Sequence, residues 1–100
     1  MFLSYSDIEL KQMIDEYIAG IDSEFSYFSI CDHIVTRAFA EDKVEREPHV
    51  KYTSNAISTR DGYRISRMLW EKIWNQEIFT LFGKSSDAAF YNEDTMYIKV

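Results

Sequence analysis

The chain has 100 residues, of which 46 % are apolar, and its 17 acidic side chains against 11 basic ones give a net charge of −6. This length and composition are typical of one folded domain, so we expect residues 1–100 to form a single domain. The one cysteine, Cys31, excludes an intramolecular disulfide and a cysteine-based zinc module. The N-terminus lacks the basic and apolar regions of a secretion signal, and the longest apolar run, Ala88 to Tyr91, is too short to cross a bilayer. We therefore expect a cytoplasmic protein with no membrane partner.

The first predicted helix covers about residues 7–19. Ser6 precedes it and Glu9 stands three residues later, which is the spacing of a capping box. Gly20 is a natural end for this helix. At 100° per residue its apolar side chains form one stripe, which comprises Leu10, Met13, Ile14, Tyr17 and Ile18.

The second predicted helix covers about residues 29–40, with Ser29 as its N-cap and Asp32 three residues further on. Before it, Phe25 to Phe28 alternates aromatic and polar residues, which predicts a short strand or an extended connector. Cys31 lies in the first turn, where the helix dipole could activate its thiol, although a small buried apolar residue is the simpler interpretation. A loop is expected over residues 41–57.

The third predicted helix covers about residues 59–75 and is capped by Ser58, with Asp61 three residues later. Its apolar stripe faces the core, and the opposite stripe carries three arginines at helical spacing: Arg60, Arg64 and Arg67. Three large aromatic residues flank these arginines: Tyr63, Trp70 and Trp74.

After this helix, two apolar runs separated by a polar, glycine-containing stretch predict a β-hairpin over about residues 78–91. Lys84 lies in the hairpin turn, and residues 96–100 predict a further short strand. The fold class is therefore α+β, with three helices, a β-hairpin and a third short strand.

This order of elements resembles the winged helix-turn-helix family over about residues 29–91, and the stretch from Ser58 to Tyr91 resembles its recognition helix and wing. The resemblance implies a small winged-helix-like, non-enzymatic regulatory domain. DNA would be bound through Arg60, Arg64 and Arg67 of the third helix and through Lys84 of the wing. Arginine also favours bidentate contact with guanine edges over simple attraction to phosphate.

The charge distribution supports a second hypothesis, an acidic inhibitor or adaptor module of the kind that mobile elements encode. Such a module binds a nucleic-acid-binding protein and occludes it, with its carboxylates imitating phosphates. The acids are concentrated in the first thirty residues, where Lys11 is the one base, and the candidate acidic face comprises Asp7, Glu9, Asp15, Glu16, Asp22 and Glu24. A third hypothesis is a structural subunit of a larger assembly. A simpler interpretation of the arginine stripe is that Arg60, Arg64 and Arg67 only pair with neighbouring carboxylates, and complete pairing of this kind would favour the acidic module over DNA binding.

The aromatic residues beside the arginines predict a protein interface, because Trp, Tyr and Arg concentrate binding energy where proteins meet. We therefore expect Tyr63, Trp70 and Trp74 to contact another protein or a second copy of the chain in a homodimer. We do not expect an enzyme, a cofactor, a metal site or a small-molecule substrate. His33 and His49 lack the spacing of a metal site or a hydrolytic triad, and the three glycines are too isolated to cradle a phosphate.

Overall fold

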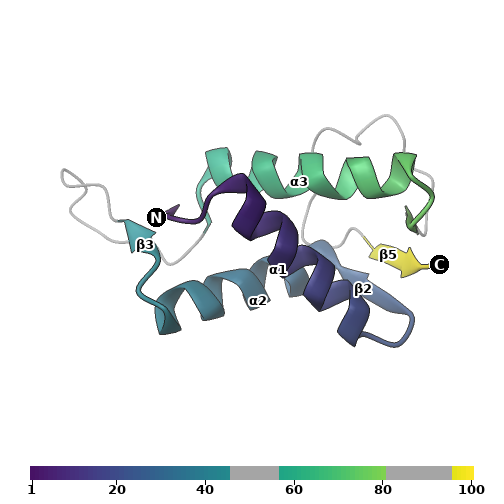
Figure 1. Ribbon diagram of the computed structural model, residues 1–100, viewed down its shortest axis with the longest axis horizontal. Coiled ribbons are helices and arrows are strands. Elements are labelled where there is room, and N and C mark those ends of the chain that lie inside the picture. The colour runs from purple at the N-terminus through teal and green to yellow at the C-terminus, as the bar shows by residue number, and fades with distance from the viewer. Residues whose placement is uncertain (46–56, 81–95) are drawn as a thin grey trace.

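The computed structural model describes residues 1–45, 57–80 and 96–100. These residues form three helices and small antiparallel sheets, which confirms the predicted α+β class. In Figure 1 the first helix crosses the molecule between the other two, and the N- and C-termini lie at opposite ends. The helices are α1 (Asp7–Gly20), α2 (Tyr27–Ala40) and α3 (Thr59–Trp74). No helix in the described part of the chain is long and apolar enough to span a membrane.

Serine residues start all three helices by accepting backbone hydrogen bonds. Ser6 and Glu9 form the capping box of α1, with the Ser6 hydroxyl oxygen 3.1 Å from the Glu9 amide and a Glu9 carboxylate oxygen 3.0 Å from the Ser6 amide. In α2 the cap is Ser26 rather than Ser29, so this helix begins two residues before its predicted start. Ser29 is the third residue of α2 and the second member of this capping box, and its amide donates to the Ser26 hydroxyl at 2.9 Å. Because both positions hold serine, the sequence alone does not show which of the two caps α2.

The larger sheet has three antiparallel strands in the order β2-β5-β4. Phe25 pairs with Tyr97, which pairs with Thr80 on its other side. The last strand therefore lies at the centre of the sheet instead of extending a hairpin at its margin. The predicted second strand of the hairpin and Lys84 lie outside the described residues. The strands are β2 (Glu24–Ser26), β4 (Ile78–Thr80) and β5 (Met96–Lys99).

A second pairing joins β1 (Phe2–Leu3) to β3 (Val44–Glu45) in antiparallel register. The loop predicted over residues 41–57 was wrong at this point, because it contains a strand. Two-residue strands show no period-2 pattern, so the sequence offered no local signal for them. This pairing anchors the N-terminal segment beside the end of α2 and leads directly into α1.

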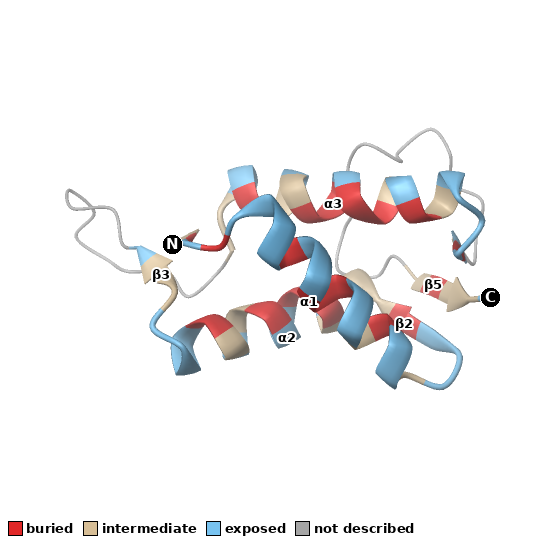
Figure 2. Cartoon of the chain, in the orientation of Figure 1, coloured by how far each residue is buried: buried red, intermediate tan, exposed pale blue. Residues whose placement is uncertain are grey.

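The core is formed by the apolar stripes of the three helices together with β4 and β5, and in Figure 2 the buried positions of each helix face its neighbours. An aromatic group joins α1 to the sheet. The ring of Phe25 stacks on Tyr97 at 5.1 Å and meets Tyr17 edge-on at 5.8 Å. Part of the high aromatic content is therefore used inside the fold. The fully buried large aliphatic side chains are Leu10, Ile14, Ile30, Ile34, Ile65, Leu69 and Ile78.

The contact between α2 and α3 depends on a small residue in α3. The Tyr27 hydroxyl donates to the carbonyl of Gly62 at 3.0 Å. A Cβ atom at Gly62 would lie 3.2 Å from this same hydroxyl oxygen. Gly62 therefore allows the close approach, although glycine inside a helix is less favourable than alanine by about 1 kcal/mol.

Two glycine-to-alanine substitutions test this contact. Gly20→Ala, at a position with nothing within 4 Å of the added Cβ, should raise the free energy of unfolding by about 0.5 kcal/mol. Gly62→Ala should be less favourable than Gly20→Ala by about 1 kcal/mol, because the added methyl displaces the Tyr27 hydroxyl. Urea unfolding followed by circular dichroism measures both. The difference should disappear in a Tyr27→Phe background, and equal effects in the wild-type background would contradict the assigned contact.

Candidate functional site

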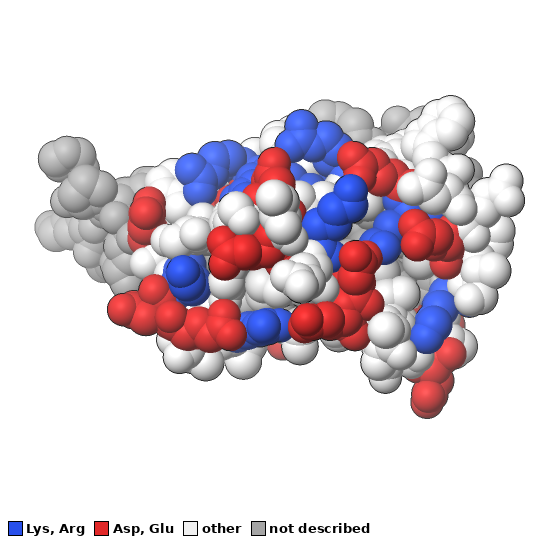
Figure 3. All heavy atoms as spheres, viewed as in Figure 1, with Lys and Arg blue, Asp and Glu red and all other residues white. Residues whose placement is uncertain are grey.

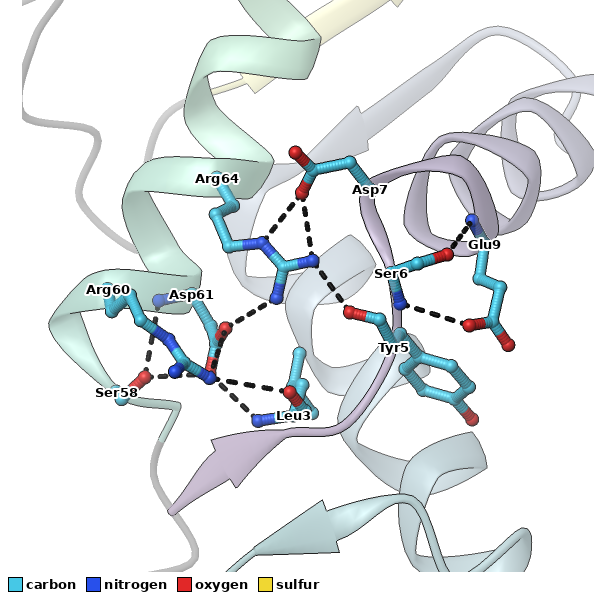
Figure 4. Close-up of polar contacts among 9 residues, drawn as sticks. All are labelled: Leu3, Tyr5, Ser6, Asp7, Glu9, Ser58, Arg60, Asp61 and Arg64. Atoms are coloured by element: carbon cyan, nitrogen blue, oxygen red, sulfur yellow. Dashed lines mark hydrogen bonds and ion pairs between the residues drawn. The ribbon is translucent and has the colours of Figure 1, made fainter.

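The three arginines predicted to line one stripe of α3 have different environments. Arg64 turns toward the N-terminal segment, and its side chain is only 16 % exposed. Its guanidinium donates to Asp61 Oδ1 at 2.9 Å, to Asp7 Oδ1 at 2.9 Å and to the Tyr5 carbonyl at 2.7 Å (Figure 4). Every nitrogen of this side chain therefore has an acceptor within the fold, so Arg64 is mainly a structural residue.

Asp61 is the partner that fixes Arg64, and it is completely buried. Its Oδ2 accepts from the Leu3 amide at 2.8 Å and from the Ser58 hydroxyl at 2.7 Å. Burial alone would raise the pKa of Asp61, but the hydrogen bonds from Leu3, Ser58 and Arg64 more than offset it and hold the pKa below its ordinary value. Asp61 is therefore an ionised carboxylate inside the protein, as Figure 4 shows it, between the start of α3 and the strand β1.

Arg60 is more exposed and belongs partly to the same cluster. Its Nη2 lies 3.4 Å from both Asp61 Oδ1 and the Leu3 carbonyl, and its guanidinium stacks over the Phe2 ring at 4.5 Å. The side chain is 55 % exposed, so a ligand can still reach one side of it. Arg67 is exposed, and in the described part of the chain its side chain makes no hydrogen bond or ion pair. The fourth predicted DNA contact, Lys84, lies outside the described residues.

The six acids of the predicted acidic face also divide into two groups. Four of them have partners inside the molecule: Asp7 pairs with Arg64, Asp15 with Lys72 and Glu16 with Arg37, while Glu9 caps α1. The remaining two, Asp22 and Glu24, are exposed, and within the described ranges their side chains make no ion pair or hydrogen bond. Asp32 on α2 is also exposed, and its side chain makes no ion pair or hydrogen bond within the described ranges.

Figure 3 shows how these charges are distributed on one face of the molecule. Carboxylates form an interrupted band along the lower edge of the view, over α2 and the C-terminal part of α1, with basic side chains between them. On the upper part, over α3, acidic and basic side chains are mixed. This view shows no continuous basic face on α3.

The three aromatic residues predicted to form an interface differ in exposure. Trp74 is 79 % exposed and Tyr63 is 51 % exposed, whereas Trp70 is half-buried. All three lie on the side of α3 that faces away from its buried positions, Ile65 and Leu69. This outward side therefore carries both exposed aromatic rings and the free Arg67.

Two buried polar contacts were missed by the sequence analysis. Lys72 is 9 % exposed and forms ion pairs with Asp15 and Glu77. Its position three residues after Leu69 places it on the inward stripe, and this spacing could have indicated its burial. Tyr5 is buried and donates to Glu41 at 2.5 Å, and burial together with Glu41 raises the pKa of the Tyr5 hydroxyl. No local pattern connects these two residues.

The remaining residues considered for chemistry are Cys31, His33 and His49. Cys31 is buried, and burial raises the pKa of its thiol to about 11, so the simpler interpretation of this residue holds. His33 is exposed and its ring lies 5.0 Å from that of Tyr17. His49 lies outside the described residues. Within residues 1–45, 57–80 and 96–100, no three His, Cys, Asp or Glu side chains are grouped to hold a metal ion.

Comparisons with known proteins found no matching family model, no significantly similar curated protein and no significantly similar solved structure.

Removing each arginine in turn tests the division between the structural and the free guanidinium. Arg64→Ala leaves the buried Asp61 carboxylate and the Tyr5 carbonyl without their strongest donor, and should lower the free energy of unfolding by about 3 kcal/mol. Arg67→Ala on the same helix should change it by less than about 0.5 kcal/mol. Urea unfolding at neutral pH measures both values. A loss for Arg67→Ala that equals the loss for Arg64→Ala would show that the cluster is assigned wrongly.

The lowered pKa of Asp61 also predicts a pH dependence of stability. Between the ordinary value of 3.8 and the lower pKa in the folded state, the unfolded chain binds more protons than the folded one. The stabilisation is therefore complete above the unfolded pKa and is lost as the pH falls through the folded pKa. Asp61→Asn should be less stable at neutral pH and should show a flatter acid limb in urea titrations from pH 5 downward. Asp22→Asn, at an exposed position, is the control and should keep the wild-type slope.

Proposed function

We propose that this chain is a non-enzymatic acidic module that binds a nucleic-acid-binding protein and occludes its basic surface. The observation that carries the proposal is that arginines of α3 are held in internal ion pairs, whereas several exposed carboxylates are not. Arg64 forms ion pairs with Asp61 and Asp7, and Arg60 forms a longer ion pair with Asp61. Exposed carboxylates of the segment after α1 and of α2 make no ion pair among the described residues.

The free carboxylates include those of Asp22 and Glu24 around the start of β2 and of Asp32 in α2. They can accept hydrogen bonds from arginine or lysine without breaking an internal ion pair, which is how phosphate oxygens are bound by such side chains. The net charge of −6 adds long-range attraction to a basic surface and speeds encounter. Tight duplex binding by the chain itself is opposed by the same charge.

Direct DNA binding by a winged-helix-like domain is the second candidate, and one observation favours it. Arg67 is exposed and free in the described part of α3, and Arg60 is half exposed. Together with Lys84 they offer about three phosphate contacts, which corresponds to a log-affinity slope of roughly −3 against log salt. This is a modest term, and the acidic remainder of the chain reduces it.

Binding to two probes separates the candidates. The first probe is a fluorescent mixed-sequence DNA duplex, and anisotropy from low to physiological salt should show no saturable binding. If the duplex binds at low salt and the Arg60→Ala plus Arg67→Ala variant loses this binding, the DNA hypothesis is correct and the acidic-module hypothesis fails. The control variant is Lys11→Ala plus Lys43→Ala, which removes the same charge from other surfaces.

The second probe is a fluorescent arginine-rich peptide that stands for the phosphate-binding surface of a partner. Asp22→Asn plus Glu24→Gln should weaken its binding about fivefold, because two free carboxylates are lost. Glu71→Gln plus Glu77→Gln changes the net charge by the same amount on side chains already paired with Lys11 and Lys72. It should have a clearly smaller effect. If both double variants weaken peptide binding equally, the binding depends only on net charge, and a specific acidic surface is refuted.

A further inference from the structure

The outward side of α3 carries four exposed side chains at helical spacing, and we call them the α3 outer stripe: Tyr63, Arg67, Glu71 and Trp74. Intervals of four, four and three residues place them on one face of the helix. Tyr63 and Trp74 are 51 % and 79 % exposed, and the Glu71 side chain is 53 % exposed. Large aromatic side chains at both ends of one exposed helix face are typical of a protein-interaction surface.

The order of residue types along this stripe is aromatic, basic, acidic, aromatic. An antiparallel partner helix of the same sequence presents the same order in reverse. In one register, Arg67 lies opposite Glu71 of the second copy, and Glu71 lies opposite Arg67 of that copy. The same register brings Tyr63 next to Trp74 of the second copy at each end. A parallel arrangement would instead place like charges opposite each other.

We propose that the α3 outer stripe binds a second copy of the chain in an antiparallel, two-fold symmetric helix pair. Two reciprocal Arg67–Glu71 ion pairs form its centre, and two Tyr63–Trp74 ring contacts form its ends. Such an interface is self-complementary, as two-fold symmetry requires. Glu71 already pairs with Lys11 at 3.2 Å, but both side chains of that pair are more than half exposed, so the Glu71 carboxylate can also accept from Arg67 of the second copy.

The size of the stripe sets the expected affinity. A fully buried aromatic side chain removes about 150–250 Å² from water, so four partly buried rings contribute on the order of several hundred Å². This is below the roughly 1,200 Å² of a stable interface, and the dimer should therefore form at micromolar to millimolar concentration. The stripe lies opposite the buried positions of α3 and shares no residue with the carboxylates of β2 and α2 named in the proposed function. Dimerisation through it is therefore independent of the proposed function.

Charge reversal with complementary mixing tests the ion pairs at the centre of the stripe. Arg67→Glu places four carboxylates at the centre of the homodimer, and Glu71→Arg places four cations there, so each variant alone should weaken self-association at least about tenfold. An equimolar mixture of the two variants restores both ion pairs and should dimerise as the wild type does. Sedimentation velocity over the micromolar to millimolar range measures association. Circular dichroism melting confirms that both variants fold.

A second pair of variants tests the rings at the ends of the stripe. Trp74→Ala should weaken association, whereas Ile8→Ala, which removes an 80 % exposed side chain from α1, should leave it unchanged. A wild-type chain that stays monomeric up to millimolar concentration overturns the proposal. A dimer that Arg67→Glu and Trp74→Ala leave unchanged also overturns it, and a mixture that fails to recover association refutes the reciprocal Arg67–Glu71 ion pairs.

Discussion

The carboxylate of Asp61 holds three segments of the chain together at the N-terminal end of α3. It accepts a hydrogen bond from the backbone of β1, accepts another from the serine that caps its own helix, and pairs with Arg64. Arg64 in turn binds the Tyr5 carbonyl and the first residue of α1, Asp7. A buried charge is strongly unfavourable unless it is paired and hydrogen-bonded, and here every neighbouring donor serves that purpose. The entry of the chain into α1 and the start of α3 are therefore fixed by the same group.

This use of Arg64 changes the meaning of the arginine stripe. In the sequence, Arg60, Arg64 and Arg67 are equivalent members of one helix face, and the pattern is typical of a helix that reads DNA. In the fold, Arg64 lies nearest to α1 and becomes part of the interior, Arg60 is shared, and Arg67 alone is fully available within the described residues. A stripe of three cations that would cooperate on a phosphate backbone is reduced to separate charges with carboxylates between them.

Features that depend on neighbouring residues, such as helix starts, are predicted from the sequence. Features that depend on contacts between distant segments are not. Ser6 and Ser58 start their helices where the capping pattern places them, because the cap and its partner lie within one turn. The central position of β5 was not predictable, because it depends on pairing with β2 and β4, far away in the chain. Asp61 illustrates the same limit within the site. Its spacing from Ser58 indicated a helix start, but its burial depends on Leu3 and on Arg64, whose direction the periodicity of α3 alone does not fix.

The net charge of −6 does not show which charges a partner would meet, because many of them are held in internal ion pairs. The helix α1 lies between α2 and α3 and uses its charges on both sides, since Glu16 binds Arg37 of α2 while Asp7, Lys11 and Asp15 bind side chains of α3. These pairs fix how α1 sits against its neighbours and remove much of its charge from what a partner meets. Asp22 and Glu24 lie after α1, and within the described residues their side chains make no ion pair or hydrogen bond, because the nearby Lys99 ammonium donates to the Ala19 and Ile21 carbonyls instead. The proposed recognition by charge therefore concerns the end of α1 and the start of β2 rather than the paired carboxylates along α1.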